Sequence, residues 1–306
     1  MGEIRRLEIY SPKILKEKKA LIISDLHREK KTGQKNLDKV KVKTQDDFPE
    51  IDFIFIVGDL LNDVNDLRDP EFRKIFIESL KDFTRGKLTF VSFGNHDKMT
   101  REGPNAWNDA DERLIKEALS EIENIIVVDN NVQRIGEIKI GSFSPDSQYY
   151  LKKGESKAEY ARQFYRQFNP NMFDSTTYNI FMTHEPQSII SISEEENAII
   201  QPHTNLVLSG HMHDGLLPTF VQRLLNKGFI PKIIRKIIKN MGLLSPQMRL
   251  LPKYAHGEHT IEETDFIINS PINTRVECPL LNELYGANAT VLTMKPSQSH
   301  QNIKRK

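Results

Sequence analysis

The sequence is short of cysteine, of net charge and of long apolar stretches. Cys278 is the only thiol, so an intramolecular disulfide and a cysteine zinc finger are excluded, which fits a reducing compartment. The formal net charge is +1, which gives no overall signature of a nucleic-acid-binding protein. The longest apolar runs, such as residues 53–57, are far shorter than the ~20 residues of a membrane-spanning helix.

Targeting signals are also missing from the sequence. Residues 1–19 are charged and lack the apolar stretch of a signal peptide. Gly2 could suggest myristoylation, but Arg6 stands where that signal needs serine or threonine. We therefore expect a cytoplasmic protein and leave open a peripheral position on the inner face of the membrane.

Five short apolar runs stand out, and each is followed by residues that can bind a metal or carry a proton. The runs cover residues 20–23, 53–57, 88–93, 179–182 and 206–208. Their composition predicts strands buried on both faces. The residues that follow them are Asp25 and His27, then Asp59, then Asn95, His96 and Asp97, then His184, and finally His211 and His213.

The segments between these runs predict helices and a second sheet. Residues 70–83 and 109–122 carry apolar stripes at helical spacing, so strand–helix–strand order favours parallel pairing. A further helix is expected at residues 154–168. Shorter strands are expected at residues 125–129, 132–135, 138–143, 266–269 and 289–294. We expect an α/β fold that forms a single domain over residues 1–306, with two packed sheets and helices outside them.

The polar residues all stand at the carboxyl ends of predicted strands, where open α/β sheets collect their ligands. Together they supply enough oxygen and nitrogen donors for two adjacent divalent cations. Such a pair activates water and clamps both the attacking and leaving oxygens of a phosphate ester. A donor set of Asp, His and Asn without thiolate favours Mn²⁺, Fe, Zn²⁺ or Co²⁺, and manganese is our first choice.

This motif order resembles the calcineurin-like metallophosphoesterase family over residues 21–213, and the strand pattern extends the likeness over most of the chain. The resemblance implies a four-layer α/β/β/α sandwich of two mixed sheets with a dinuclear metal site. It assigns one metal to Asp25, His27 and His213, the other to Asn95, His184 and His211, and the bridging role to Asp59. It further implies that a metal-bridged hydroxide attacks phosphorus, that His96 protonates the leaving oxygen, and that Asp97 orients the His96 imidazole.

Two basic segments flank these residues. Residues 28–43 form either a solvated loop and helix or an electropositive rim for a polyanionic substrate. Residues 215–251 contain no Asp or Glu. Their apolar residues recur at helical spacing among basic residues, which predicts basic amphipathic helices. This insert packs on the protein's own core or an oligomer partner, or it forms a lid or a contact with anionic membrane through residues 218–244. A calmodulin-like or nucleic-acid role is a further alternative.

The segment Pro252-Lys253-Tyr254 resembles a bacterial branch of the same family that includes membrane-associated phosphodiesterases and relatives of UDP-2,3-diacylglucosamine pyrophosphatases. His256 and His259 follow it, either as surface histidines or as substrate contacts. We therefore expect hydrolysis of a phosphodiester or pyrophosphate bond in a lipid-linked or membrane-associated substrate. The alternatives are a nuclease or nucleotide phosphodiesterase, and a non-catalytic scaffold on the same fold. The oligomeric state is left open.

Overall fold

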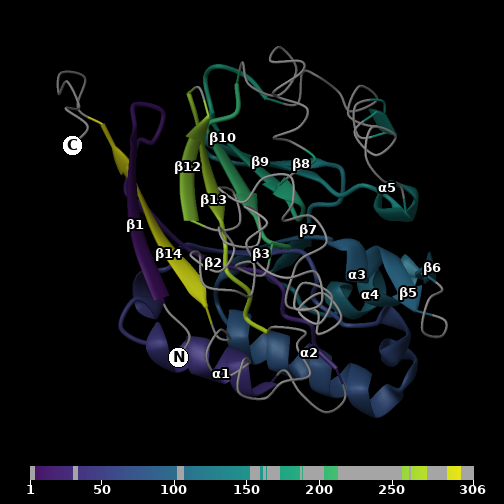
Figure 1. Ribbon diagram of the computed structural model, residues 1–306. Coiled ribbons are helices and arrows are strands. Elements are labelled where there is room, and N and C mark those ends of the chain that lie inside the picture. Colours follow the sequence, from purple (N-terminus) through teal and green to yellow (C-terminus); the bar gives the residue numbers. More distant parts are fainter. Residues whose placement is uncertain are drawn as a thin grey trace, which may run out of the picture.

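The computed structural model contains two six-stranded mixed sheets packed face to face (Figure 1). The first sheet has the order β1-β14-β2-β3-β4-β7, the second has the order β12-β13-β11-β10-β9-β8, and β5 pairs with β6 in a separate hairpin. The structure describes residues 4–29, 34–101, 107–151, 159–160, 163, 173–186, 188, 203–212, 257–261, 263–273 and 288–297.

Both sheets combine parallel and antiparallel pairs. In the first sheet only the β14–β2 pair is antiparallel, and in the second only the outer pairs β8–β9 and β12–β13 are. The strands of the first sheet are β1 Ile4–Ser11, β2 Lys18–Ile23, β3 Phe53–Val57, β4 Leu88–Ser92, β7 Ile125–Val127 and β14 Ala289–Pro296. Those of the second are β8 Val132–Ile135, β9 Ile138–Phe143, β10 Tyr178–Thr183, β11 Leu206–Ser209, β12 Gly257–Ile261 and β13 Thr264–Ile268.

Helices connect the parallel strands of the first sheet. The described helices are α1 Gln34–Lys43, α2 Pro70–Thr84, α3 Asn95–Lys98, α4 Glu112–Ser120 and α5 Ser147–Leu151, with 3-10 turns η1 Phe48–Glu50 and η2 Val64–Arg68. The start of α2 follows from its sequence: the Asp69 carboxylate accepts hydrogen bonds from the N–H groups of Glu71 and Phe72, and Pro70 occupies the first turn.

Strand β3 shows how the layers are held together. Alternate side chains point to opposite faces of a strand. Ile54 therefore packs with Phe76 of α2 in the cluster beneath the helices, while Phe55 packs with Ile180 of β10 in the cluster between the sheets. A third cluster covers the outer face of the second sheet and includes Tyr149 of α5. The expected α/β/β/α sandwich is confirmed, with α5 as the described part of the fourth layer.

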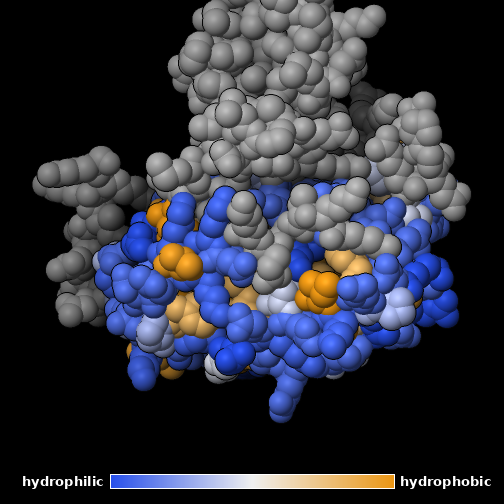
Figure 2. Space-filling model, turned by 90° about the horizontal axis from the view of Figure 1, so that it is seen from below, coloured by the Kyte–Doolittle hydropathy of each residue, from blue (hydrophilic) through white to orange (hydrophobic). Residues whose placement is uncertain are grey.

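The layer that contains α1 and α2 forms the lower face of the molecule. Apolar side chains on this face are scattered among hydrophilic ones (Figure 2). Val42 of α1 and Ile75 of α2 are among the exposed large apolar residues, at 64% and 47% exposure. Isolated exposed apolar residues are ordinary for a surface that faces water.

The five expected ligand-bearing strands are all present as β2, β3, β4, β10 and β11. The sequence did not lead us to expect β1, β12 or the β5–β6 hairpin of Met99–Arg101 and Trp107–Asp109. The insert 215–251 and most of the expected helix 154–168 lie outside the described residues. None of the helices within the described part of the chain is long and apolar enough to cross a membrane.

Candidate dinuclear metal centre

Two loops at the ends of β2 and β3 are joined by backbone hydrogen bonds. The N–H of Asp25 donates to the carbonyl of Gly58 over 3.1 Å, and the N–H of His27 donates to the carbonyl of Asp59 over 2.9 Å. Because β2 and β3 are parallel neighbours, their carboxyl ends open at the same edge of the sheet. The bonds continue that pairing past the strands and hold Asp25, His27 and Asp59 in one small region.

The backbone is strained at four of the expected ligands. Asp25, His27, Asp59 and His211 have positive φ angles of 53°, 40°, 52° and 66°. A residue with a side chain rarely occupies this region, and such strain costs about 1–3 kcal/mol per residue. Strain that recurs at the candidate ligands is typical of a site where the surrounding structure forces side chains together for a function.

Glycines allow the two sheets to approach each other at this point. A Cβ atom on Gly58 would lie 2.3 Å from Nδ1 of His184, and one on Gly94 would lie 2.3 Å from Oδ1 of Asp59. Both separations are far below van der Waals contact. The glycines in the loops after β3 and β4 therefore make room for Asp59 and for His184, which follows a strand of the second sheet.

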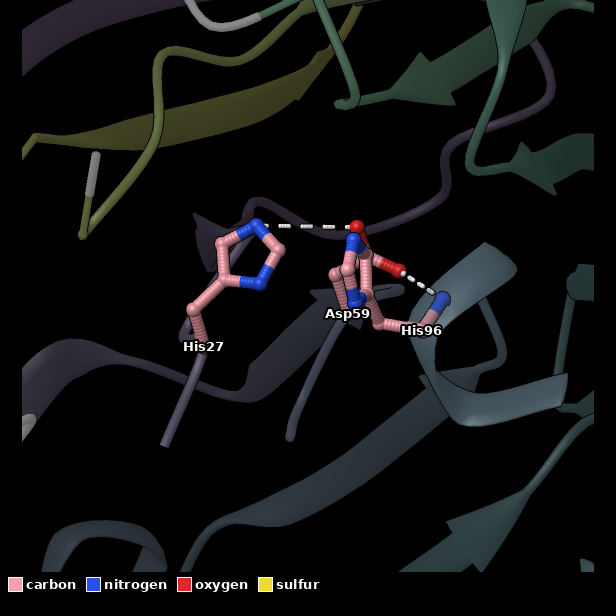
Figure 3. A group of neighbouring side chains, drawn as sticks. All are labelled: His27, Asp59 and His96. Atoms are coloured by element: carbon pink, nitrogen blue, oxygen red, sulfur yellow. Dashed lines mark hydrogen bonds and ion pairs between the residues drawn. The ribbon is translucent and has the colours of Figure 1, made fainter. Parts of the chain in front are cut away.

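Asp59 stands at the centre of the cluster, with 1% exposure (Figure 3). Its Oδ2 atom lies 3.0 Å from Nε2 of His184 and 3.6 Å from Nε2 of His27. Its Oδ1 atom accepts a hydrogen bond of 2.9 Å from the backbone N–H of His96. One carboxylate thus faces two imidazoles that come from different sheets.

Asp25 and His211 complete the cluster from the other side. The Oδ1 atom of Asp25 lies 3.9 Å from Nε2 of His27 and 3.8 Å from Nε2 of His184. Its Oδ2 atom accepts a hydrogen bond from the backbone N–H of His211 over 3.1 Å. The rings of His211 and His184 meet nitrogen to nitrogen at 3.1 Å. Five side chains that follow β2, β3, β10 and β11 thus converge on one site.

The donor atoms fall into two sets that share one carboxylate. His27, Asp59 and His96 form one set, and Asp59, His184 and His211 form the other, with the ligand atoms of each set within 4.8 Å of one another. Asn95 adds a buried side-chain oxygen, Oδ1, that accepts no hydrogen bond within the described part of the chain. Carboxylate, imidazole and amide donors arranged in this way fit two adjacent divalent cations.

The charges in the cluster shift the pKa values of its members strongly. Burial alone would raise the pKa of Asp59, but the nearby imidazoles, led by His184, hold that pKa well below its ordinary value. Burial lowers the pKa of His184, yet the carboxylates of Asp59 and Asp25 outweigh it and raise the pKa to about 10. Burial and repulsion from Asp59 raise the pKa of Asp97 to about 7. Such concentrated perturbation is typical of functional sites.

Asp97 does not make the contact that we expected of it. Its Oδ2 atom accepts a hydrogen bond of 2.9 Å from the N–H of Gly94, and its Oδ1 atom accepts bonds from the N–H groups of Leu60 and Leu61. The His96 ring instead bonds through Nδ1 to the carbonyl of Asn62 at 2.9 Å. Asp97 therefore ties the loop after β4 to the loop after β3, and a backbone carbonyl orients the imidazole.

The structure also places residues that the sequence did not single out. Asn62 contributes the carbonyl that bonds to His96, and Trp107 of β6 contacts the His96 ring. Burial raises the pKa of Tyr150 well above its usual value, and Glu185, Asp59 and Asp97 add to the shift, so its phenol lies near the cluster. No sequence signal marks these contacts, because each depends on how loops pack.

Other expected residues lie elsewhere or outside the description. His213 and His256 fall outside the described residues. His259 lies on edge strand β12, opposite Phe266, and belongs to neither donor set. Within the basic segment 28–43, Arg28 is 2% exposed and Lys41 pairs with Asp82 of α2. Those two cations therefore do not contribute to an open basic rim.

Comparison with known proteins agrees with this geometry. The family model described as "Calcineurin-like phosphoesterase" matches residues 18–215. An uncharacterized metallophosphoesterase of Campylobacter jejuni is 26% identical over 229 residues, which cover 74% of this chain and 53% of that protein. The chain thus spans about half the length of the curated relative it matches.

Two solved structures show weaker likeness. A dimetal phosphatase from Danio rerio aligns over 83% of this chain and 87% of its own, with a TM-score of 0.42 and 6% identity. A purple acid phosphatase from yellow lupin aligns over 66% of this chain and 39% of its own, with a TM-score of 0.36 and 13% identity. Because the family model spans well over half of the 306 residues, the protein belongs to the calcineurin-like phosphoesterase family.

Proposed function

We propose that the protein hydrolyses phosphate esters with the help of two divalent cations. The observation that carries this proposal is the position of Asp59, whose carboxylate belongs to both donor sets. Asp25, His27 and Asp59, together with His213, would hold one cation. Asp59, Asn95, His184 and His211 would hold the other. When bound, the pair supplies Lewis-acid activation of a water molecule and of the ester.

His96 is the proposed general acid. Its Nδ1 atom bonds to a carbonyl oxygen, which can only accept, so Nδ1 carries a proton in the neutral ring as well as in the charged one. His96 therefore acts as an acid in its imidazolium form, in which Nε2 carries the second proton, the one that is transferred. The oxygen of water bonds to phosphorus and releases one proton to solvent, the bond from phosphorus to the leaving oxygen breaks, and the Nε2 proton passes to that oxygen. A proton from solvent then restores His96. Proton transfer of this kind contributes about 10²–10⁴-fold to a rate. Asp97 supports His96 indirectly, by fixing the loops on which Asp59, Asn95 and His96 stand.

The preferred substrate is a phosphodiester or pyrophosphate, and the preferred metal is Mn²⁺. The test is one panel with the purified protein and Mn²⁺, Zn²⁺ or Mg²⁺, in which a generic phosphomonoester is compared with a generic phosphodiester. His96→Ala and Asp59→Asn serve as catalytic controls. The proposal predicts metal-dependent turnover that both substitutions abolish or greatly reduce. No turnover with any metal would favour the alternative of a non-catalytic scaffold.

The lipid part of the proposal is motivated by the acid-free basic insert 215–251 alone. A cytoplasmic protein with such a segment can dock on anionic lipid at the inner face of a membrane or cover a lipid-linked substrate. Flotation with anionic and neutral vesicles tests the idea, with a deletion of residues 220–244 as the comparison. Binding to anionic vesicles that the deletion removes is the expected result. No binding, together with unchanged turnover in the deletion, would contradict it.

A nuclease or nucleotide phosphodiesterase is the second candidate, favoured by the lysines that follow His27. It predicts cleavage of single-stranded nucleic acid or cyclic nucleotides at rates that fall steeply as salt rises, because phosphate contacts release counterions. Salt-independent turnover of a small diester with no cleavage of nucleic acid would contradict this candidate.

A further inference from the structure

Trp107 stands directly beside the proposed general acid. The rings of Trp107 and His96 meet edge to face, with centroids 5.4 Å apart and planes at 81°. The ring of His27 meets His96 in the same manner at 4.9 Å. His96 therefore contacts both a candidate metal ligand and a tryptophan. His96 is only 5% exposed, whereas Trp107 is half-buried.

The β5–β6 hairpin holds Trp107 in this place. Strand β5 continues directly from α3, which carries His96, and its pairing brings Trp107 opposite Arg101 and Asp109 opposite Met99. The N–H of Ala110 then donates to the carbonyl of Lys98 over 2.9 Å and closes the hairpin at its base. The position of the indole next to His96 is thus fixed by the backbone.

A cavity of about 390 Å³ opens next to the hairpin. Asp109 lies two residues from Trp107, on the same side of β6, and lines this cavity. The other lining residues are Lys98, Ala110, Glu112, Arg113, Asp146, Ser147 and Gln148. Lys98 already pairs with Glu112 at 3.3 Å and Asp129 at 3.0 Å. Arg113 pairs with Asp111 at 2.9 Å. Because both cations of the lining are paired, the cavity has little attraction for a phosphate and can take an uncharged group.

We infer that Trp107 determines specificity by binding an aromatic leaving group of the ester. The inference rests on the proposed function, since a leaving oxygen that takes its proton from His96 must lie against that ring. The group attached to the oxygen then meets the indole of Trp107 and extends toward the cavity. Contact between aromatic rings strengthens binding about three- to tenfold beyond simple burial. The size of the cavity suits one ring system with polar substituents.

The first test measures binding without turnover. Trp107 is the sole tryptophan of the chain, so tryptophan fluorescence reports on this site alone. The full-length protein with Mn²⁺ is titrated with phenylphosphonate and with methylphosphonate, neither of which has an ester bond to hydrolyse. Phenylphosphonate should change the emission and bind about three- to tenfold more tightly. Equal affinity for the two compounds, with no change in emission, would overturn the inference even if the protein proves to be an active hydrolase.

The second test uses kinetics with matched variants. In the wild-type protein kcat/KM should favour phenyl phosphate over methyl phosphate by more than the difference in leaving-group acidity, and the ratio measured in Trp107→Leu serves as that baseline. Trp107→Leu should lower the phenyl-to-methyl ratio about three- to tenfold, mainly through KM, and Trp107→Phe should restore it. A ratio unchanged in Trp107→Leu, or an equal loss with both esters, would show a structural role and contradict the inference. Fluorescence binding without turnover of any ester would instead leave the inference standing and refute the proposed function.

Discussion

Oδ2 of Asp59 lies 3.0 Å from Nε2 of His184, and the two side chains come from different sheets. Asp59 follows β3 of the first sheet, and His184 follows β10 of the second. The cluster therefore lies where the two sheets meet. The packing of Phe55 against the second sheet helps to set the distances within the cluster. A site built in this way depends on the whole sandwich.

Asp59→Asn tests the shared carboxylate. The amide keeps the shape of the side chain but removes the negative charge that both donor sets use. We expect kcat/KM to fall at least about 100-fold, the scale of losing one group that stabilises charge in a transition state. Steady-state assays with added metal measure it. Asp82→Asn, an exposed change on α2, is the matched control and should retain full activity; full activity in Asp59→Asn would contradict the assignment.

His96→Gln separates proton donation from metal binding, because His96 also belongs to a donor set. If His96 is the general acid, an alkyl ester should lose about 10²–10⁴-fold in kcat, since alkoxide leaves poorly without a proton. A 4-nitrophenyl ester should lose much less, and the metal content should stay at the wild-type value. An equal loss with both esters, together with a lower metal content by mass spectrometry, would identify His96 as a ligand instead.

Metal binding should depend on pH through His184. Its pKa is raised to about 10 because the nearby carboxylates outweigh burial, so the ring is protonated in the metal-free protein at neutral pH. This proton stabilises the metal-free fold most below the unfolded pKa of about 6.5, and that stability is lost as pH rises through about 10. A cation must displace the same proton, so metal affinity should rise with pH in this range.

Calorimetry in two buffers of different ionisation enthalpy measures that proton release directly. The wild-type protein should release about one proton from this ring for each cation bound at the second donor set. His184→Gln should remove this release, and His259→Gln on the edge strand β12 is the matched control that should retain it. An affinity that is flat between about pH 6 and about pH 8, with no proton release, would contradict this assignment.

Gly94→Ala tests the close approach of the loop after β4 to Asp59. The added methyl group would lie 2.3 Å from Oδ1 of Asp59, so the carboxylate must move. We expect a loss of about 1–3 kcal/mol in the free energy of unfolding and a much weaker metal affinity. Gly136→Ala is the comparison: its φ of 58° strains the backbone, but nothing lies within 4 Å of the new methyl group. Denaturant unfolding with a chelator, followed by metal titration, distinguishes them. Unchanged metal binding in Gly94→Ala would contradict the argument.

The sequence was sufficient to predict the strands that carry the cluster. Runs such as Phe53–Val57 are buried on both faces, so continuous apolarity marks them, and polar residues at their ends are conspicuous. The edge strand Ile4–Ser11 was missed because its residues alternate between partly buried and exposed, and because its pairing with β14 joins opposite ends of the chain. That pairing is a property of the fold and leaves no local pattern.

The finer features of the site depend on loop packing in the same way. Asp97 looked like a partner for the neighbouring imidazole, but its carboxylate bonds to backbone N–H groups of two loops. The expected helix 109–122 begins only at Glu112, because Trp107–Asp109 pairs with β5 as strand β6. Trp107 reaches His96 through that hairpin. Residue types and spacing indicated which groups gather, while their contacts required the three-dimensional structure.

The most direct test of the account is a crystal structure of the protein soaked in Mn²⁺, with anomalous scattering used to locate the metal. The account predicts two anomalous peaks about 3.5–4 Å apart on either side of the Asp59 carboxylate, one toward His27 and one toward His184 and His211. A single peak that does not touch Asp59, or no peak among these side chains, would contradict it.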